Sequence, residues 1–128
     1  MEEIKKQKIK SFTDLNAWKE SHWLVIEIYK ITNKFPKEEQ FGLTNQIRRA
    51  VVSITSNIAE GFSRQSLKEK AQFYSMALGS LTEVQNQLLI SRDIKYVDDE
   101  IFDKVADRTV VINKLLNGLI KSVKSAYE

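Results

Sequence analysis

VVSITSNIAEGFSR, residues 51–64, combines apolar residues at helical spacing with a dense set of small polar ones. Val51, Ile54 and Ile58 recur every three or four residues, which places them on one face of a helix. Serine, threonine and asparagine weaken a helix interior because their side chains compete for backbone hydrogen bonds. The polar face of this helix must therefore meet either water or a neighbour that makes polar contacts.

The same apolar face continues upstream of the opening stretch. The pattern predicts a helix that begins at Glu38 or Leu43 and ends near Phe62. Gly61 is predicted to mark the helix end, because glycine adopts the left-handed conformation there most easily. The apolar stripe comprises Leu43, Ile47, Ala50, Val51, Ile54 and Ile58. The adjoining and opposite faces carry a second, polar stripe of Gln46, Arg49, Ser53, Ser56, Asn57, Glu60 and Arg64.

Two further segments with helical period flank this helix. One runs from about Thr13 to Asn33, with Pro36 just beyond its end. This segment is apolar on more than one side, so we expect it to be buried within the domain and against another subunit. The next begins at Ser66, and Glu69 completes a capping-box pattern three residues later. Its predicted core face comprises Tyr74, Ala77, Leu78, Leu81, Val84 and Leu88.

A fourth helix is predicted to begin near Asp98, where acidic residues suit the positive end of a helix dipole. Its predicted stripe comprises Ile101, Val105, Ile112, Leu115, Leu119 and Val123. Four amphipathic helices joined by short connections predict an all-α fold, an up-down-up-down four-helix bundle. We assign residues 13–128 to this domain and residues 1–12 to a basic N-terminal tail.

Composition narrows the class of protein further. A length of 128 residues fits one domain, and the four glycines and one proline disfavour a fold with many turns. The absence of cysteine excludes disulfides and thiolate metal sites. No apolar run approaches about 18 residues, and the charged N-terminus lacks a signal-peptide core. We therefore expect a cytoplasmic protein that does not enter a membrane.

The sequence offers little for catalysis or metal binding. His22 is the sole histidine, and Lys19 stands where a Glu-x-x-His metal pair needs a glutamate. There is no HExxH, P-loop or dinucleotide-binding motif. The acidic residues 98–100 are explained better by the helix dipole than by a magnesium site. We predict no catalytic residues, no metal and no cofactor.

Basic residues concentrate around the opening stretch and are the candidate nucleic-acid-binding residues: Arg48, Arg49, Arg64, Lys68 and Lys70. Exposed cations attract phosphate groups without reading base sequence, because binding releases condensed counterions. Such charges can also simply solvate the surface of a bundle. In another alternative, Arg49, Ser53, Asn57 and Glu60 form a buried polar network, with Glu83 as a partner for one arginine.

Three stretches carry a resemblance to a known family: FTDLNAWKES at 12–21, YKITNKFPKEEQFGLTNQIRRAVVSITSNIAEGFSR at 29–64 and FYSMALGSLTEVQNQLLISRDIKY at 73–96. The core IRRA…SI..NIAEG followed by A.GSL.E is specific. On these motifs the chain resembles the 23S rRNA-intervening sequence proteins, also described simply as four-helix-bundle proteins. Some members are encoded inside insertions in large-subunit ribosomal RNA genes, and their function is not established.

This resemblance implies a short four-helix bundle that assembles into a ring-shaped homopentamer. A related branch is similar to the accessory proteins of diversity-generating retroelements, which are basic, bind nucleic acid and engage a reverse transcriptase. The motif positions that carry over are Arg48, Arg49, Ser53, Asn57, Glu60 and Gly61. With Glu83 as a further candidate, the last four of these form the predicted structural polar motif.

Two functional hypotheses follow. The first is a non-enzymatic, oligomeric bundle that binds RNA or DNA backbones through a cationic surface. The alternative is a structural or protein-interaction module with no nucleic-acid role. Both involve self-assembly, for which we expect Trp18, Trp23, Leu24 and Ile28 to expose apolar surface in several directions. We also expect Asn57 and Glu60 to be mostly buried and hydrogen-bonded, within the subunit or at its interface.

Overall fold

Four long helices account for most of the chain in the computed structural model, which describes residues 8–127. They are α1 (Asn16–Thr32), α2 (Leu43–Ser63), α3 (Leu67–Asp93) and α4 (Asp99–Tyr127), with short 3-10 helices η1 (Phe12–Asp14) and η2 (Lys37–Glu39) before α1 and α2. No strand occurs within this span. The all-α prediction is confirmed.

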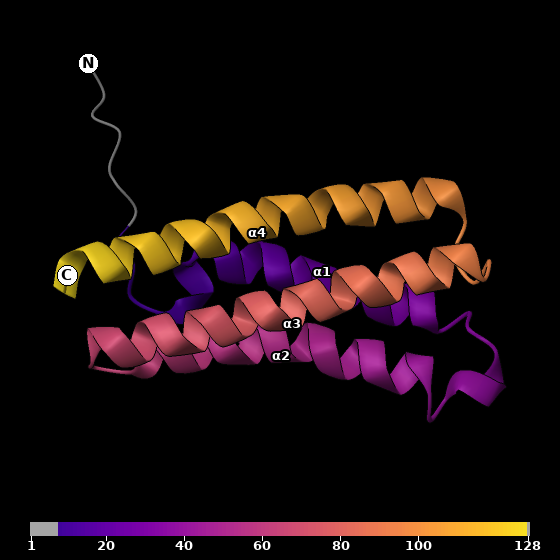
Figure 1. Cartoon of the computed structure of the whole chain (residues 1–128), viewed down its shortest axis with the longest axis horizontal. Coiled ribbons are helices and arrows are strands. Elements are labelled where there is room, and N and C mark those ends of the chain that lie inside the picture. Colours follow the sequence, from indigo (N-terminus) through magenta and orange to yellow (C-terminus); the bar gives the residue numbers. More distant parts are fainter. Residues whose placement is uncertain (1–7, 128) are drawn as a thin grey trace, which may run out of the picture.

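Successive helices run in opposite directions, so the chain forms an up-down-up-down four-helix bundle (Figure 1). The most extensive contact joins α2 to α3, followed by that between α3 and α4. Helix α1 closes the bundle by packing against α2 and α4. Because α4 runs antiparallel to α3, it ends at the same end of the bundle as the connection between α2 and α3.

The core takes large aliphatic side chains from all four helices. Those that are fully buried include Leu24, Ile28, Ile47, Ile54, Ile58, Leu81, Leu88, Ile112 and Leu116. Burial of one such side chain stabilises the fold by about 1.5–3 kcal/mol. The stripe predicted for α2 is confirmed, since its members from Ile47 to Ile58 are buried and Leu43 is half-buried.

Helix α1 begins later than Thr13 because a 3-10 turn precedes it. Ser11 caps this turn by accepting a hydrogen bond from the Thr13 N–H, while Asp14 accepts from the N–H groups of Lys10 and Ser11. These backbone donors hold the pKa of Asp14 below its ordinary value. At the start of α3, Ser66 Oγ accepts from the Glu69 N–H at 3.3 Å, as the capping pattern predicts.

The stripe predicted for α4 is wrong at its first residue and misses part of the core face. Val105 and Ile112 are buried as expected, and Leu115, Leu119 and Val123 are half-buried and pack against the core, but Ile101 is exposed. The most deeply buried face comprises Phe102, Val105, Thr109, Ile112 and Leu116. Two apolar stripes of helical period share Val105 and Ile112, and sequence periodicity cannot separate them.

Thr109 belongs to the true core face of α4 although it is polar. Its hydroxyl donates to the Ala106 carbonyl and accepts from Gln85 Nε2 at 3.1 Å, so both its donor and its acceptor are satisfied. A polar group buried with its partners carries little penalty. Because its hydroxyl has both hydrogen-bond partners, Thr109 can lie on the face of α4 that packs against α3.

The apolar breadth of α1 has a different explanation from the predicted one. Leu24 and Ile28 are fully buried, and Trp18 and Trp23 are half-buried, so the four side chains do not form an exposed surface. Lys104 and Arg108 lie over the Trp23 ring at 5.6 and 5.0 Å from its centroid and cover it. Ile26 and Tyr29 of α1 are nevertheless exposed, so the burial of this helix against another subunit stays a prediction.

Gly61 does not end α2, which continues to Ser63, and it does not adopt a left-handed conformation. It is buried against α3. A Cβ atom at this position would lie 2.8 Å from Tyr74 Cε1 and 3.0 Å from Phe73 Cβ, which is closer than packed carbon atoms tolerate. Glycine is needed here because α3 approaches the backbone of α2 directly.

We expect Gly61→Ala to lower the free energy of unfolding by about 1–3 kcal/mol, because the added methyl group forces Tyr74 or the helix to move. Gly79→Ala is the matched control: Gly79 also lies in a helix, and a Cβ there would meet nothing within 4 Å. That substitution is expected to stabilise the chain by roughly 0.5–1 kcal/mol. Urea unfolding measures both, and equal effects would contradict the close approach.

Candidate functional site

A chain of hydrogen bonds joins the polar face of α2 to α3. Asn57 Nδ2 donates to the Ser53 carbonyl at 2.9 Å and to Ser53 Oγ at 3.0 Å. Ser53 Oγ in turn lies 2.8 Å from Ser80 Oγ on α3. The half-buried Asn57 is therefore hydrogen-bonded within the subunit, and part of the polar stripe connects two helices.

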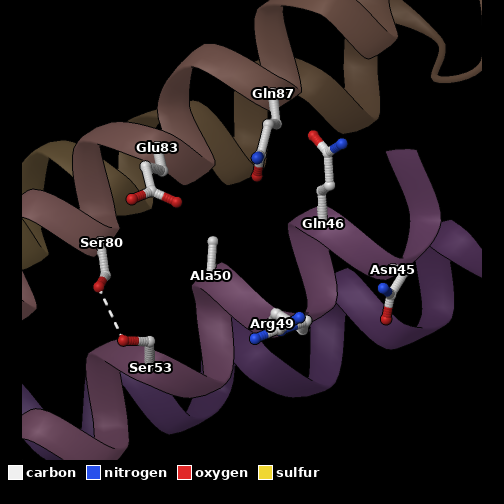
Figure 2. Close-up of a pocket in the computed structure, with 8 residues that line it drawn as sticks. All are labelled: Asn45, Gln46, Arg49, Ala50, Ser53, Ser80, Glu83 and Gln87. Atoms are coloured by element: carbon white, nitrogen blue, oxygen red, sulfur yellow. Dashed lines mark hydrogen bonds between the residues drawn. The ribbon is translucent and has the colours of Figure 1, made fainter. Parts of the chain in front are cut away.

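Beyond the two serines, α2 and α3 border a groove of about 410 Å³ (Figure 2). Its lining residues are Asn45, Gln46, Arg49, Ala50, Ser53, Ser80, Glu83 and Gln87. Arg49 projects from α2 and Glu83 from α3, and neither forms an ion pair with any residue in the span 8–127. The groove therefore presents one cation and one anion among uncharged polar groups.

Gln87 is the most buried polar side chain of this groove, at 9% exposure. Its Oε1 atom has no hydrogen-bond partner among the described residues. A buried acceptor without a partner destabilises a fold by about 1–3 kcal/mol, so this amide is suited to a donor from outside the chain. The groove is thus a polar recess rather than a sealed part of the core.

Arg48 and Arg49 point to different sides of α2: Arg48 toward α1 and Arg49 toward the groove with α3. Arg48 Nε donates to Thr32 Oγ1 at 2.8 Å, and its guanidinium lies 4.5 Å from the centroid of the Tyr29 ring. The pairing of Arg48 or Arg49 with Glu83 that the buried-network alternative requires is not formed. Consecutive residues on a helix differ by about 100° in direction, which explains why the two arginines separate.

Glu60 is exposed and pairs with Arg64, so the expectation that it is buried within the subunit is wrong. The pair lies one helical turn apart, where a glutamate and an arginine meet naturally on a helix surface. The Arg64 guanidinium also lies 4.8 Å from the centroid of the Phe73 ring. Arg64 thus has two intrachain contacts at the junction of α2 and α3.

Lys70 completes the C-terminal end of α2. Its Nζ donates to the carbonyls of Phe62 at 2.7 Å and Gly61 at 3.3 Å in the last turn of the helix. The Gly61 carbonyl also accepts from the Arg64 N–H at 3.2 Å. Lys68, two residues earlier, is exposed and borders a shallow groove with Lys124 and Tyr127 of α4. Lys70 therefore has a structural role, whereas Lys68 faces solvent.

The structure also places two lysines of α4 at this end, which the sequence analysis had not included among the candidate binding residues. Lys124 faces Lys68 across the shallow groove, and Lys121 lies one turn before it on α4. Their proximity follows from the antiparallel order of the helices, which brings the end of α4 to the α2–α3 connection. We define the basic end as Arg64, Lys68, Lys70, Lys121 and Lys124.

The opposite end of the bundle, where α4 begins, carries a group of seven acidic side chains: Glu38, Glu39, Asp93, Asp98, Asp99, Glu100 and Asp103. A few lysines are interspersed with them. Here Glu39 accepts a hydrogen bond from the Tyr96 hydroxyl at 3.1 Å, and this bond raises the pKa of Tyr96. The charge of the chain is therefore distributed unevenly along the bundle axis.

Metal-binding chemistry has no support in residues 8–127, where no three histidine, aspartate or glutamate side chains gather as a ligand set. His22 instead stacks on the Trp18 ring, with 4.7 Å between centroids. In the same span, none of the helices combines the length and the hydrophobicity that crossing a bilayer requires.

The fold and the site define a small helical-bundle protein whose polar groups gather in one interhelical groove and at one basic end. Residues 13–118 match the model of the 23S rRNA-intervening sequence protein, and the chain belongs to this family. No match was found among curated proteins.

A solved structure supports the same assignment. The chain is similar to a protein of unknown function from the S23 ribosomal protein family of Bacteroides thetaiotaomicron, with a TM-score of 0.76 and 25% sequence identity. The match covers 82% of this chain and 95% of the other. The resemblance to the family is therefore confirmed, and the solved structure shares this fold.

Asn57→Ala is expected to lower the free energy of unfolding by about 1 kcal/mol, because it removes the donor of the chain of hydrogen bonds that reaches α3. Asn117→Ala is the control, since Asn117 makes the same pattern of bonds to Asn113 on an exposed face. Its effect is expected to stay within about 0.5 kcal/mol. Chemical denaturation compares the two variants. If Asn57→Ala leaves the free energy of unfolding unchanged, the polar stripe is merely part of the exposed surface.

Proposed function

We propose that the protein is a non-enzymatic, self-assembling bundle that binds RNA or DNA backbones through its basic end. The observation that supports this function most directly is the group of Lys68, Lys121 and Lys124. Their ammonium groups form no ion pair or hydrogen bond with any residue of the span 8–127, so they remain available to phosphates.

The uneven charge along the bundle favours one orientation on a nucleic acid. Phosphates are attracted to the basic end and repelled by the carboxylates at the start of α4. Contacts of lysine with phosphate release counterions and carry no sequence information. The proposed interaction is therefore sensitive to salt and is made mainly with the backbone.

Self-assembly is the second element of the proposal, and the α3–α4 face supports it. Large apolar side chains are exposed along this face, namely Met76, Leu89, Val110 and Tyr127. Apolar surface of this kind often marks an interface between proteins. The assembly that we propose is the ring-shaped homopentamer implied by the family resemblance, and it would repeat the weak phosphate contacts of each subunit.

A structural or protein-interaction module without nucleic acid is the second candidate function. It is favoured by the intrachain contacts of Arg48, Arg64 and Lys70, which engage three of the five cations predicted for binding. In this alternative the bundle assembles or meets a protein partner, and the remaining lysines only solvate its surface.

The test reverses the charge of the three available lysines, in the variant Lys68→Glu, Lys121→Glu and Lys124→Glu. We expect it to lose binding to mixed-sequence RNA and DNA at low salt by at least about tenfold, because phosphate contacts become repulsive. The wild-type salt dependence is expected to be steep, and each lysine lost lowers its slope by about 1. Fluorescence anisotropy at several salt concentrations measures both quantities.

The matched control reverses three exposed lysines toward the opposite end, Lys30, Lys34 and Lys95, with the same change in net charge. We expect this control to retain most of the binding. Equal losses in the two variants would show that net charge, not the basic end, governs the interaction. A wild-type chain with no detectable binding at low salt would rule out the nucleic-acid function and leave the second candidate.

A further inference from the structure

The most exposed large apolar side chain of the described residues is Phe41, which is 89% exposed. It lies in the connection between η2 and α2, at the end of the bundle opposite the basic end. An aromatic ring left in water at this level loses most of the stabilisation that its burial would give. Interfaces between proteins are often centred on an aromatic side chain of this kind.

The connection that carries Phe41 is held firmly in place by Glu39. One carboxylate oxygen of Glu39 accepts from the Tyr96 hydroxyl, and the other accepts from the Leu43 N–H. The Gly42 N–H donates to the Glu39 carbonyl at 2.9 Å. A Cβ on Gly42 would lie 2.8 Å from the Glu39 carboxylate, so glycine leaves room for this arrangement. The backbone on both sides of Phe41 is thus held in place, which reduces the entropy that the connection loses on binding.

The α3–α4 face offers a recess that matches such a side chain. A pocket of about 300 Å³ is lined by Gln85, Leu88, Leu89, Phe102, Ala106, Thr109 and Val110, which are mostly apolar. Leu89 and Val110 stand at its edge, with 43% and 50% exposure. No residue of the span 8–127 fills this pocket, and Phe41 of the same chain does not reach it.

The surroundings of the two features carry charges of both signs, and they include one opposite pair. Lys37 and Glu38 of η2 precede Phe41 by four and three residues, and both are exposed. Asp103 and Asp107 are exposed on α4, seven and three residues before Val110 at the pocket edge. Lys37 is the group near Phe41 that can pair with these carboxylates, in keeping with the polar rim that surrounds the apolar centre of a specific interface.

We propose that Phe41 of one copy inserts into the α3–α4 pocket of the next copy. This contact rests on the self-assembly proposed above and names the residues that make it. Phe41 and the pocket lie on different surfaces of the chain. Each copy therefore contacts one neighbour through its Phe41 and another neighbour through its pocket. Such a head-to-tail contact can repeat from copy to copy, and it closes into a ring when the rotation allows.

Two single substitutions test the contact from its two sides. Phe41→Ser removes the inserted ring, and Val110→Glu places a carboxylate at the pocket edge. Both sites are solvent-exposed in the single chain, so the fold is expected to survive, which circular dichroism checks. In analytical ultracentrifugation at micromolar concentration, we expect an oligomeric wild type and a monomer for each variant.

The matched controls are Val111→Glu, an exposed residue next in sequence that does not line the pocket, and Gln40→Ser, next to Phe41. Both are expected to remain oligomeric.

An equimolar mixture of the two test variants, Phe41→Ser and Val110→Glu, distinguishes a head-to-tail contact from any other. The Val110→Glu chain still carries Phe41, and the Phe41→Ser chain still carries an intact pocket, so the mixture is expected to form dimers and nothing larger.

Different outcomes overturn different statements. A monomeric wild type would reject both the proposed self-assembly and this contact. An oligomeric wild type whose size is unchanged by Phe41→Ser or by Val110→Glu would leave the assembly standing and reject the contact. A mixture of the two variants that stays monomeric would also reject the contact, because the mixture contains both an intact Phe41 and an intact pocket.

Discussion

The close contact between α2 and α3 is the constraint on which the rest of the structure depends. At Gly61 the backbone of one helix meets the Tyr74 side chain of the other with no room for a Cβ atom. Further along, Ser53 and Ser80 are near enough to share a hydrogen bond. Small residues at both points let two long helices lie side by side, and this pair forms the most extensive contact of the bundle.

The candidate site follows from this contact. Because small residues occupy the seam, the longer polar side chains at its border, Arg49, Glu83 and Gln87, stand around a groove instead of meeting across it. The connection between the two helices is short, so the basic residues that flank it gather at one end. Antiparallel packing then brings the lysines of α4 to the same place. The electrostatic character of the bundle is therefore a consequence of its topology.

Much of the fold could be predicted from helical periodicity, including the number and order of the helices and the core stripe of α2. The predicted α4 stripe missed Phe102, Thr109 and Leu116, because two registers share Val105 and Ile112 and only the position of α3 selects the one with Thr109. The role of Gly61 escaped prediction because a helix end and a close approach both call for glycine. The site was predicted less well. The partners of Arg48 and Lys70 depend on contacts between elements that sequence spacing does not contain, whereas the pair of Glu60 and Arg64 lies at a spacing that could have been read from the sequence.

The final turns of α4 differ from the remainder of the bundle in how strongly they are held. Between Lys121 and Tyr127, Val123 is half-buried and every other side chain is exposed. Local opening is cheapest where few apolar contacts would be broken. This segment can therefore fray while the α2–α3 pair stays closed, and Lys121 and Lys124 are carried on it. In the proposed function, a basic surface on such a segment would adapt to the irregular spacing of phosphates along a folded RNA, at the expense of selecting one particular shape.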